Sequence, residues 1–167
     1  NFYGESRQPH ALLAALSELR AEVPDLAARV RFDCYGQIEP SLLARVRSLG
    51  IADIVACHGI RPVHETIGHL VAADALIATT RSLRGAQAEI PSKIFDYLGA
   101  RREAVLFAPA DYDVARLTQA MPSVTRIDPA DRTATLGWLR ARLAAQARGE
   151  LDRRPHRERP LEPLAAS

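Results

Sequence analysis

One segment of the chain, residues 89–98, carries a charged pair at a spacing that suits ligand binding. Lys93 and Asp96 stand three positions apart, which places them on one face if the segment is helical. A helix start offers free amides and a partial positive charge to a phosphate, and Lys93 would add a full charge. Asp96 can accept two hydrogen bonds from a ribose diol. The pair therefore indicates a site for a nucleoside diphosphate, and a solvated ion pair on an amphipathic helix is the alternative that spacing leaves open.

The elements that would position this pair follow from the apolar pattern and from the Gly and Pro residues between its segments. Apolar residues recur at helical spacing in some segments and alternate or run together in others. The packed face of the helix at 91–98 is expected to consist of Ile94, Phe95 and Leu98. Strands are predicted at 30–34, 54–57, 75–78, 104–107 and 124–127, and helices at 9–19, 40–49, 62–71, 91–98, 111–121 and 136–143.

Strands that alternate with helices imply right-handed crossovers and a parallel sheet with helices on both faces, so the predicted fold class is α/β and Rossmann-like. Asn1 to Gly4 reads as the end of a further strand and the loop after it. Ligands of such sheets bind beyond the carboxyl ends of the strands. The loops expected to carry the chemistry are those at Gly4, Gly36, Gly59, Thr80 and Pro109.

Composition limits the classes of function. The 167 residues fit one compact domain, and a net charge of +2 argues against capture of nucleic acid by charge alone. Cys34 and Cys57 each lie in an apolar strand-like run, so buried, reduced thiols are expected. No apolar run is long enough to cross a bilayer, and no signal peptide is found. A cytoplasmic protein is expected, with peripheral contact to a membrane as an open alternative.

Residues 91–98, with the sequence PSKIFDYL, resemble the Pro-x-Lys-x-x-Glu-Tyr-Leu signature of B-type glycosyltransferases, in the C-terminal domain of the retaining, family-4-like group (glycosyl transferases group 1). Further matches follow in the same order. Phe2-Tyr3-Gly4 with Arg7 is similar to the opening of that domain. Residues 54–59 are similar to its Val-x-Phe-x-Gly strand end, and residues 72–76 are similar to its Tyr-x-x-Ala-Asp-Val segment. The resemblance spans residues 2–148, which would form the nucleotide-sugar-binding domain, and residues 149–167 would form a loosely ordered tail.

The resemblance implies a donor site that needs no metal. Gly4 and Arg7 would lie near the diphosphate, and Asp96 would bind the ribose. His58 and Gly59 would lie near the base. The pyrophosphate and the sugar would be lined by Ile90, Pro91, Ser92 and Lys93.

Catalysis at such a site must stabilise the negative charge that grows on the departing diphosphate, and cations and amides do this where no metal is present. Arg7 and Lys93 are therefore the candidate catalytic residues. The Asp-x-Asp of Asp111 and Asp113 resembles the metal site of A-type glycosyltransferases, but acidic residues are also favoured at a helix start, and no metal site is expected. His64 and His69 are five positions apart and do not share a helix face.

Two features depart from the family pattern. Family members carry two glutamates eight positions apart, whereas Ala88 and Asp96 occupy these positions here, which leaves the contacts to the transferred sugar open. A Gly-x-Pro turn is replaced by residues 101–103, Arg-Arg-Glu, and an irregular turn is expected there. We expect a basic rim that consists of Arg81, Arg84, Arg101 and Arg102. This rim would either be solvated or attract a phosphorylated acceptor or an anionic membrane.

The expected activity is that of a hexosyltransferase that uses a nucleotide-sugar donor with retention. An upstream domain of the same protein would bind the acceptor, so the chain alone is expected to bind nucleotide weakly and to transfer no sugar. A nucleotide-sugar epimerase of related fold and a degenerate nucleotide-binding or interaction domain are the alternatives. A receiver-like domain is disfavoured because the acidic cluster that it needs at the first strand end is not seen.

Overall fold

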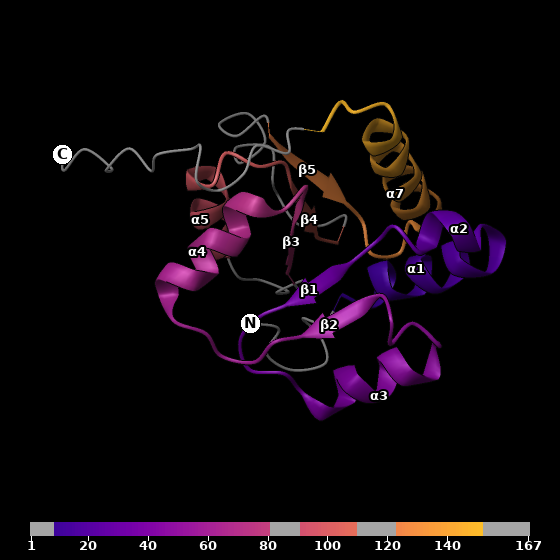
Figure 1. The fold of residues 1–167 in the computed structure, drawn as a ribbon, viewed down its shortest axis with the longest axis horizontal. Helices are drawn as coiled ribbons and strands as arrows, with labels where there is room; N and C mark the ends of the chain where they lie inside the picture. Colours follow the sequence, from indigo (N-terminus) through magenta and orange to yellow (C-terminus); the bar gives the residue numbers. More distant parts are fainter. Residues whose placement is uncertain (1–8, 81–90, 110–122, 152–167) are drawn as a thin grey trace.

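The computed structural model of the chain describes residues 9–80, 91–109 and 123–151 (Figure 1). Within these residues strands and helices alternate, as predicted. The helices are α1 (His10–Glu22), α2 (Pro24–Ala27), α3 (Pro40–Ser48), α4 (Val63–Ala72), α5 (Lys93–Gly99) and α7 (Arg132–Ala147), and the strands are β1 (Phe32–Cys34), β2 (Val55–Cys57), β3 (Leu76–Thr79), β4 (Ala104–Phe107) and β5 (Val124–Ile127).

Most of the predicted elements are confirmed. β4 and β5 have the predicted bounds, and the bounds of the other strands and of the helices differ by a few residues. The sequence pattern missed α2, a single turn that begins at Pro24, where a missing amide costs nothing, and carries Asp25 in its first turn. The helix predicted at 111–121 lies outside the described residues.

The described strands are all parallel, but they form two sheets where one was predicted. β1 pairs with β2, with Phe32 opposite Val55, and β4 lies between β3 and β5. In the doubly wound order, the strand that precedes the first helix lies in the middle of the sheet, which here is the position between β1 and β3. No described residue occupies this position. The segment predicted to end such a strand, Asn1 to Gly4, lies outside the described residues.

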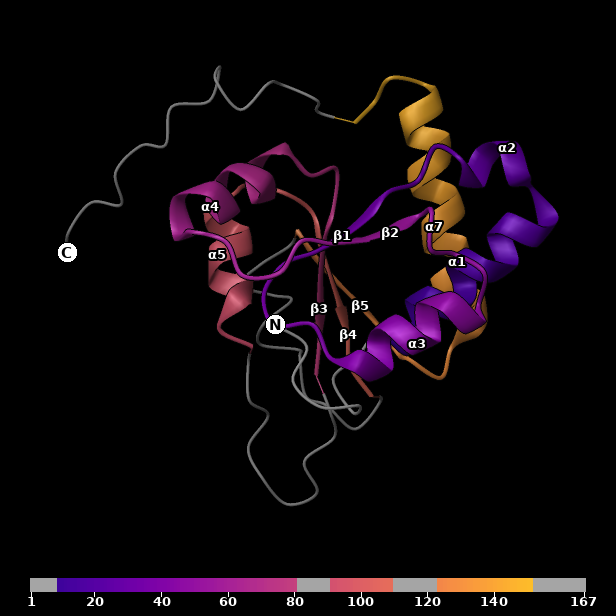
Figure 2. The same ribbon diagram turned by 60° about the horizontal axis from the view of Figure 1, so that its bottom comes forward.

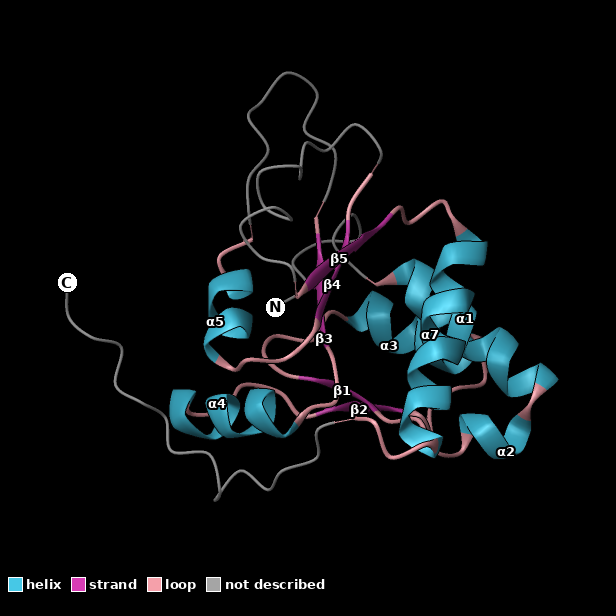
Figure 3. Cartoon of the chain, turned by 90° about the horizontal axis from the view of Figure 1, so that it is seen from above, coloured by secondary structure: helices cyan, strands magenta, loops and turns pink. Residues whose placement is uncertain are grey.

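Helices cover the strands from two sides. Figures 2 and 3 show α4 and α5 on one side of β3, β4 and β5, and α1, α2, α3 and α7 on the other. Helices are needed on both sides of the strands because all four residues of β4 are buried. Val105 and Phe107 belong to the core under α1 and α7, whereas Ala104 and Leu106 belong to the core under α4 and α5. A continuous apolar run of this kind is typical of a parallel strand covered on both faces.

The packed face of α5 differs from the predicted one. Ile94 and Tyr97 are buried and Leu98 packs against them, but Phe95 is 56% exposed, so the prediction that Phe95 points inward is wrong. Positions 94, 97 and 98 form a helical stripe, and position 95 falls about 100° away from Ile94 on the helix. The buried Tyr97 hydroxyl donates a hydrogen bond to the carbonyl oxygen of Ile77, 2.8 Å away, and so ties α5 to β3.

The turn after α5 is irregular, as expected from the replacement of Gly-x-Pro. Arg101 has a positive φ of 53°, a left-handed conformation that glycine adopts more easily. Arg102 was placed on a basic rim, and this prediction is wrong because Arg102 is buried. Its Nε donates a hydrogen bond to the carbonyl oxygen of Val71, 2.7 Å away, at the last turn of α4, where carbonyls lack partners within the helix. Arg81 and Arg84 lie outside the described residues.

The two cysteines sit opposite each other on β1 and β2 and are free thiols. Cys34 is buried, as predicted, but Cys57 is exposed, so its predicted burial is wrong. The exposure of β2 increases along the strand, from the buried Val55 to the exposed Cys57. None of the helices within the described residues has the length and the apolar composition that a membrane-spanning helix needs.

The packed face of α5 can be tested with two neighbouring substitutions. Ile94→Ala should lower the free energy of unfolding by about 2–4 kcal/mol, because it removes buried methyl groups and leaves a cavity. Phe95→Ala should lower it by less than about 1 kcal/mol, because that ring is more than half exposed. Urea unfolding followed by circular dichroism measures both. A larger loss for Phe95→Ala than for Ile94→Ala would show that the face is assigned wrongly.

Candidate functional site

A cavity of about 730 Å³ is lined by residues of both sheets. One wall comes from residues 29–36, which run through β1, and another from residues 74–77, where β3 begins. α4, α5 and α7 close it with side chains such as His69, Lys93 and Trp138. β1 is the strand of its sheet nearest to β3 (Figures 1 and 3). The cavity therefore lies at the junction of the two sheets.

Lys93 and Asp96 both line this cavity from the first turn of α5. The two residues that the sequence analysis assigned to one cleft therefore line the same cavity. They share the cavity with Asp33 and Tyr35, which lie at the carboxyl end of β1. The sequence pattern did not connect these two pairs because about sixty residues separate them, with one pair at the end of a strand and the other on a helix.

The other predicted site residues are placed as follows. Pro91 and Ser92 immediately precede α5, and neither lines the cavity. Ser92 occupies the N-cap position without a capping hydrogen bond from its side chain. Gly4, Arg7 and Ile90 lie outside the described residues.

The loop after β2 carries His58 and Gly59. Neither residue lines the cavity, whereas the next two, Ile60 and Arg61, do. Gly59 has a positive φ of 70°, and its carbonyl oxygen accepts a hydrogen bond from the amide of Gly36, 2.8 Å away. This bond extends the pairing of β1 and β2 beyond the strands, so the loops that follow them are held together.

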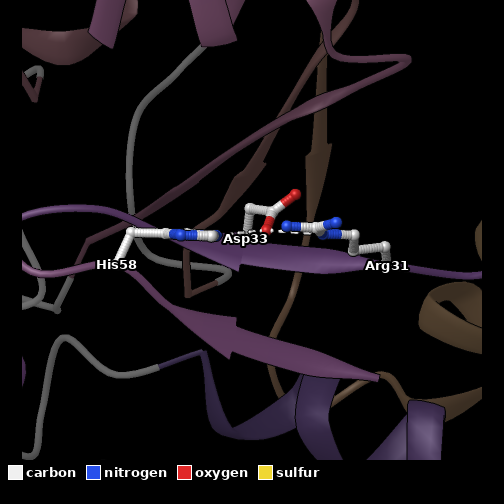
Figure 4. A network of polar contacts seen from close by, with 3 residues as sticks. All are labelled: Arg31, Asp33 and His58. Carbon is white, nitrogen blue, oxygen red and sulfur yellow. Dashed lines mark hydrogen bonds and ion pairs between the residues drawn. The ribbon is translucent and has the colours of Figure 1, made fainter. Parts of the chain in front are cut away.

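His58 acts on the cavity through Asp33. Its Nε2 lies 2.5 Å from Oδ1 of Asp33, and Nε of Arg31 donates a hydrogen bond to the same oxygen, 2.8 Å away (Figure 4). Because an ionised carboxylate only accepts, Nε2 of His58 carries a hydrogen. Partial burial by itself raises the pKa of Asp33, but the hydrogen bonds from His58 and Arg31 together hold it below its usual value. Asp33 is therefore an ionised group with a fixed orientation at neutral pH.

Tyr35 joins three elements through its ring. It stacks with His58, at 4.6 Å between ring centroids and 13° between planes, and with His69 of α4, at 4.7 Å and 21°. Burial and the nearby charge of Asp33 raise the pKa of the Tyr35 hydroxyl, so the phenol stays protonated. We call Tyr35, His58 and His69 the aromatic stack. It connects the ends of β1 and β2 to α4 beside the cavity.

Sequence reasoning missed Asp33, Tyr35 and His69 as site residues. A signal for Asp33 was present, because a charged residue between Phe32 and Cys34 is unusual in a strand and often has a role. The stack left no such signal, since its rings come from three separate segments.

The cavity combines groups that suit a polar, partly anionic ligand. Lys93 and Arg61 can donate to an anion, whereas Asp33 and Asp96 can accept from hydroxyl groups. Among the described residues, no group of three or more His, Cys, Asp and Glu side chains could hold a metal ion.

Comparison with known proteins adds no further constraint on the site. No protein-family model and no curated protein matches the chain. The resemblance to B-type glycosyltransferases therefore depends on the short motifs in the sequence.

The contact between Asp33 and its two donors predicts a pH-dependent contribution to stability. Because its folded-state pKa is lowered, Asp33 contributes stability that is present above its unfolded pKa of about 4 and is lost as the pH falls through the lower, folded value. Asp33→Asn should therefore cost about 1 kcal/mol at pH 7 and much less near pH 3. Urea unfolding at the two pH values measures the difference. Glu65→Gln on α4, at an exposed carboxylate, is the control, and an equal loss for Asp33→Asn at both pH values would refute the assignment.

Proposed function

We propose that the chain binds a nucleoside-diphosphate sugar in this cavity, as the donor-binding domain of a B-type glycosyltransferase. The observation that carries the proposal is that Lys93 and Asp96 line one cavity together with Asp33 and Tyr35. Ligands of parallel α/β folds bind beyond the carboxyl ends of the strands, and here the carboxyl end of β1 lines the cavity, whereas β3 contributes its first residues. The short motifs that resemble the glycosyltransferase family, residues 91–98 above all, supply the identity of the ligand.

The size of the cavity agrees with such a ligand. Sites for small molecules usually enclose about 300–1,000 Å³, and this cavity measures about 730 Å³. Lys93 supplies a point charge for the diphosphate, and Arg61, from the loop after β2, is a second cation at the same cavity. Asp96 would accept hydrogen bonds from the ribose hydroxyls.

The base would lie against the aromatic stack. The imidazole of His69 is exposed, lines the cavity and already stacks on Tyr35. A nucleobase can extend such a stack, and stacking of this kind contributes about 1–3 kcal/mol per base. In this arrangement His58 is a positioning residue, because it contacts Asp33 and Tyr35 and does not itself line the cavity.

Sugar transfer from this donor would depend on stabilisation of the departing diphosphate. Lys93 is the described residue proposed for this role, and Arg7 is a second candidate from the sequence. The acceptor and any base that activates it are proposed to lie in another domain of the same protein. The proposal for this chain is therefore donor binding, and transfer is a property of the whole enzyme.

Nucleotide binding and its dependence on α5 provide the direct test. Isothermal titration calorimetry with uridine, guanosine and adenosine diphosphates should detect binding of at least one of them below millimolar concentration. Lys93→Gln and Asp96→Asn should each weaken that binding about tenfold, the cost of one charge-assisted contact. Phe95→Ala, on the same helix but outside the cavity, should leave it unchanged. No binding of the three nucleotides at millimolar concentration would favour a degenerate interaction domain.

Lys93 is the only lysine in the chain, which allows a second test that needs no substitution. Acetic anhydride modifies ε-amines, so acetylation of the peptide that contains residue 93 reports on Lys93 alone. Saturation with the nucleotide that binds should slow this acetylation about tenfold, because the phosphates would cover and charge-stabilise the amine. A synthetic peptide with one lysine, added to the same tube, corrects for consumption of reagent. Equal acetylation rates with and without bound nucleotide would place the phosphates away from Lys93.

A further inference from the structure

Cys34 and Cys57 face each other across the two parallel strands of the smaller sheet. The register pairs Cys34 of β1 with Cys57 of β2. Paired residues of adjacent strands point to the same side of a sheet and stand about 5 Å apart, which lies within the span that a disulfide bridges. Each thiol also affects the pKa of the other, which requires that the two side chains lie near each other.

The two thiols differ in their access to solvent. Cys34 is buried, and burial raises its pKa to about 12. Cys57 is exposed, and partial burial raises its pKa as well. An oxidant can therefore reach Cys57 first, and Cys34 is positioned to react only with Cys57. Raised pKa values make the reaction slow, which separates this pair from the reactive thiols of redox enzymes.

The position of the pair connects it to the site. Cys34 immediately precedes Tyr35, and Cys57 immediately precedes His58, so each thiol is one residue from a member of the aromatic stack. The amide of His58 donates a hydrogen bond to the carbonyl oxygen of Cys34, 2.9 Å away, so the backbones are paired at this point. A covalent link here would fix the ends of β1 and β2 behind the stack.

We infer that Cys34 and Cys57 form a reversible dithiol–disulfide pair that a low-molecular-weight disulfide such as oxidised glutathione can close. The thiolate of Cys57 attacks one glutathione sulfur, the sulfur–sulfur bond of glutathione breaks, and one glutathione leaves as a thiolate and takes up a proton. Cys34 then loses its proton to solvent, attacks the sulfur of Cys57 and releases the second glutathione. Two cysteine thiols are oxidised, and one glutathione disulfide is reduced to two thiols.

The test uses the folded chain incubated with oxidised glutathione near pH 8.5, followed by alkylation of the remaining thiols and mass spectrometry. Because the chain has two cysteines, an intramolecular disulfide can only join Cys34 to Cys57. We expect a monomer two mass units lighter than the reduced chain, with both thiols protected from alkylation and both restored by dithiothreitol. We also expect a rise of several degrees in the melting temperature.

Two single substitutions distinguish the order of events. Cys34→Ser should stop the reaction at one glutathione attached to Cys57, and Cys57→Ser should leave Cys34 unmodified while the chain is folded. Cys34→Ala is the alternative if the hydroxyl of serine destabilises the buried position, and the fluorescence of Trp138 verifies that each variant folds. Accumulation of the glutathione adduct on Cys57 in the unsubstituted chain, or a disulfide between two chains, would overturn the inference.

Discussion

Burial of β4 on both faces is the constraint on which the rest of the structure depends. Its four residues alternate between two cores, so helices must cover both sides of the strand. Parallel pairing with β3 and β5 satisfies its backbone, and parallel pairing in turn requires that each connection crosses over the sheet. These crossovers bring the carboxyl ends of the three strands to one edge, and α5, which contributes Lys93 and Asp96 to the cavity, follows β3 in the chain.

The position of the cavity follows from the division of the strands into two sheets. The doubly wound order leaves a central strand position between β1 and β3, and the cavity is lined from both sides of that position. Leu12, Leu16, Leu139 and Leu143 line it with apolar atoms from α1 and α7, and polar side chains come from the carboxyl end of β1 and the first turn of α5. We therefore assign ligand recognition to the polar end. The apolar part belongs to the same core that packs β1 against α1 and α7.

The features that the sequence predicted are those that depend on neighbours along the chain. β4 and β5 were found because a short apolar run between turn residues has one simple interpretation. The face of α5 was partly wrong, because over seven residues Ile94 fits a stripe with Phe95 and Leu98 nearly as well as one with Tyr97 and Leu98. Arg102 was wrong for a different reason, since its partner, the carbonyl of Val71, is thirty-one residues away. The contacts of Asp33 with His58 and of Tyr35 with His69 are also nonlocal, and no periodicity reports them.

The two hydrogen bonds that Asp33 accepts allow an acidic residue to lie in the wall of a cavity for an anionic ligand. An uncompensated carboxylate beside the cavity would repel a diphosphate, and the repulsion would be strong where water is scarce. Arg31 and His58 both donate to the same oxygen of Asp33, so the negative charge is offset by donors that come from the residue before β1 and from the loop after β2. Asp33 then serves to orient His58, and His58 in turn supports Tyr35 through ring stacking. The acidic residue thereby contributes to the shape of the site, while Lys93 and Arg61 line the cavity as cations that can attract the diphosphate.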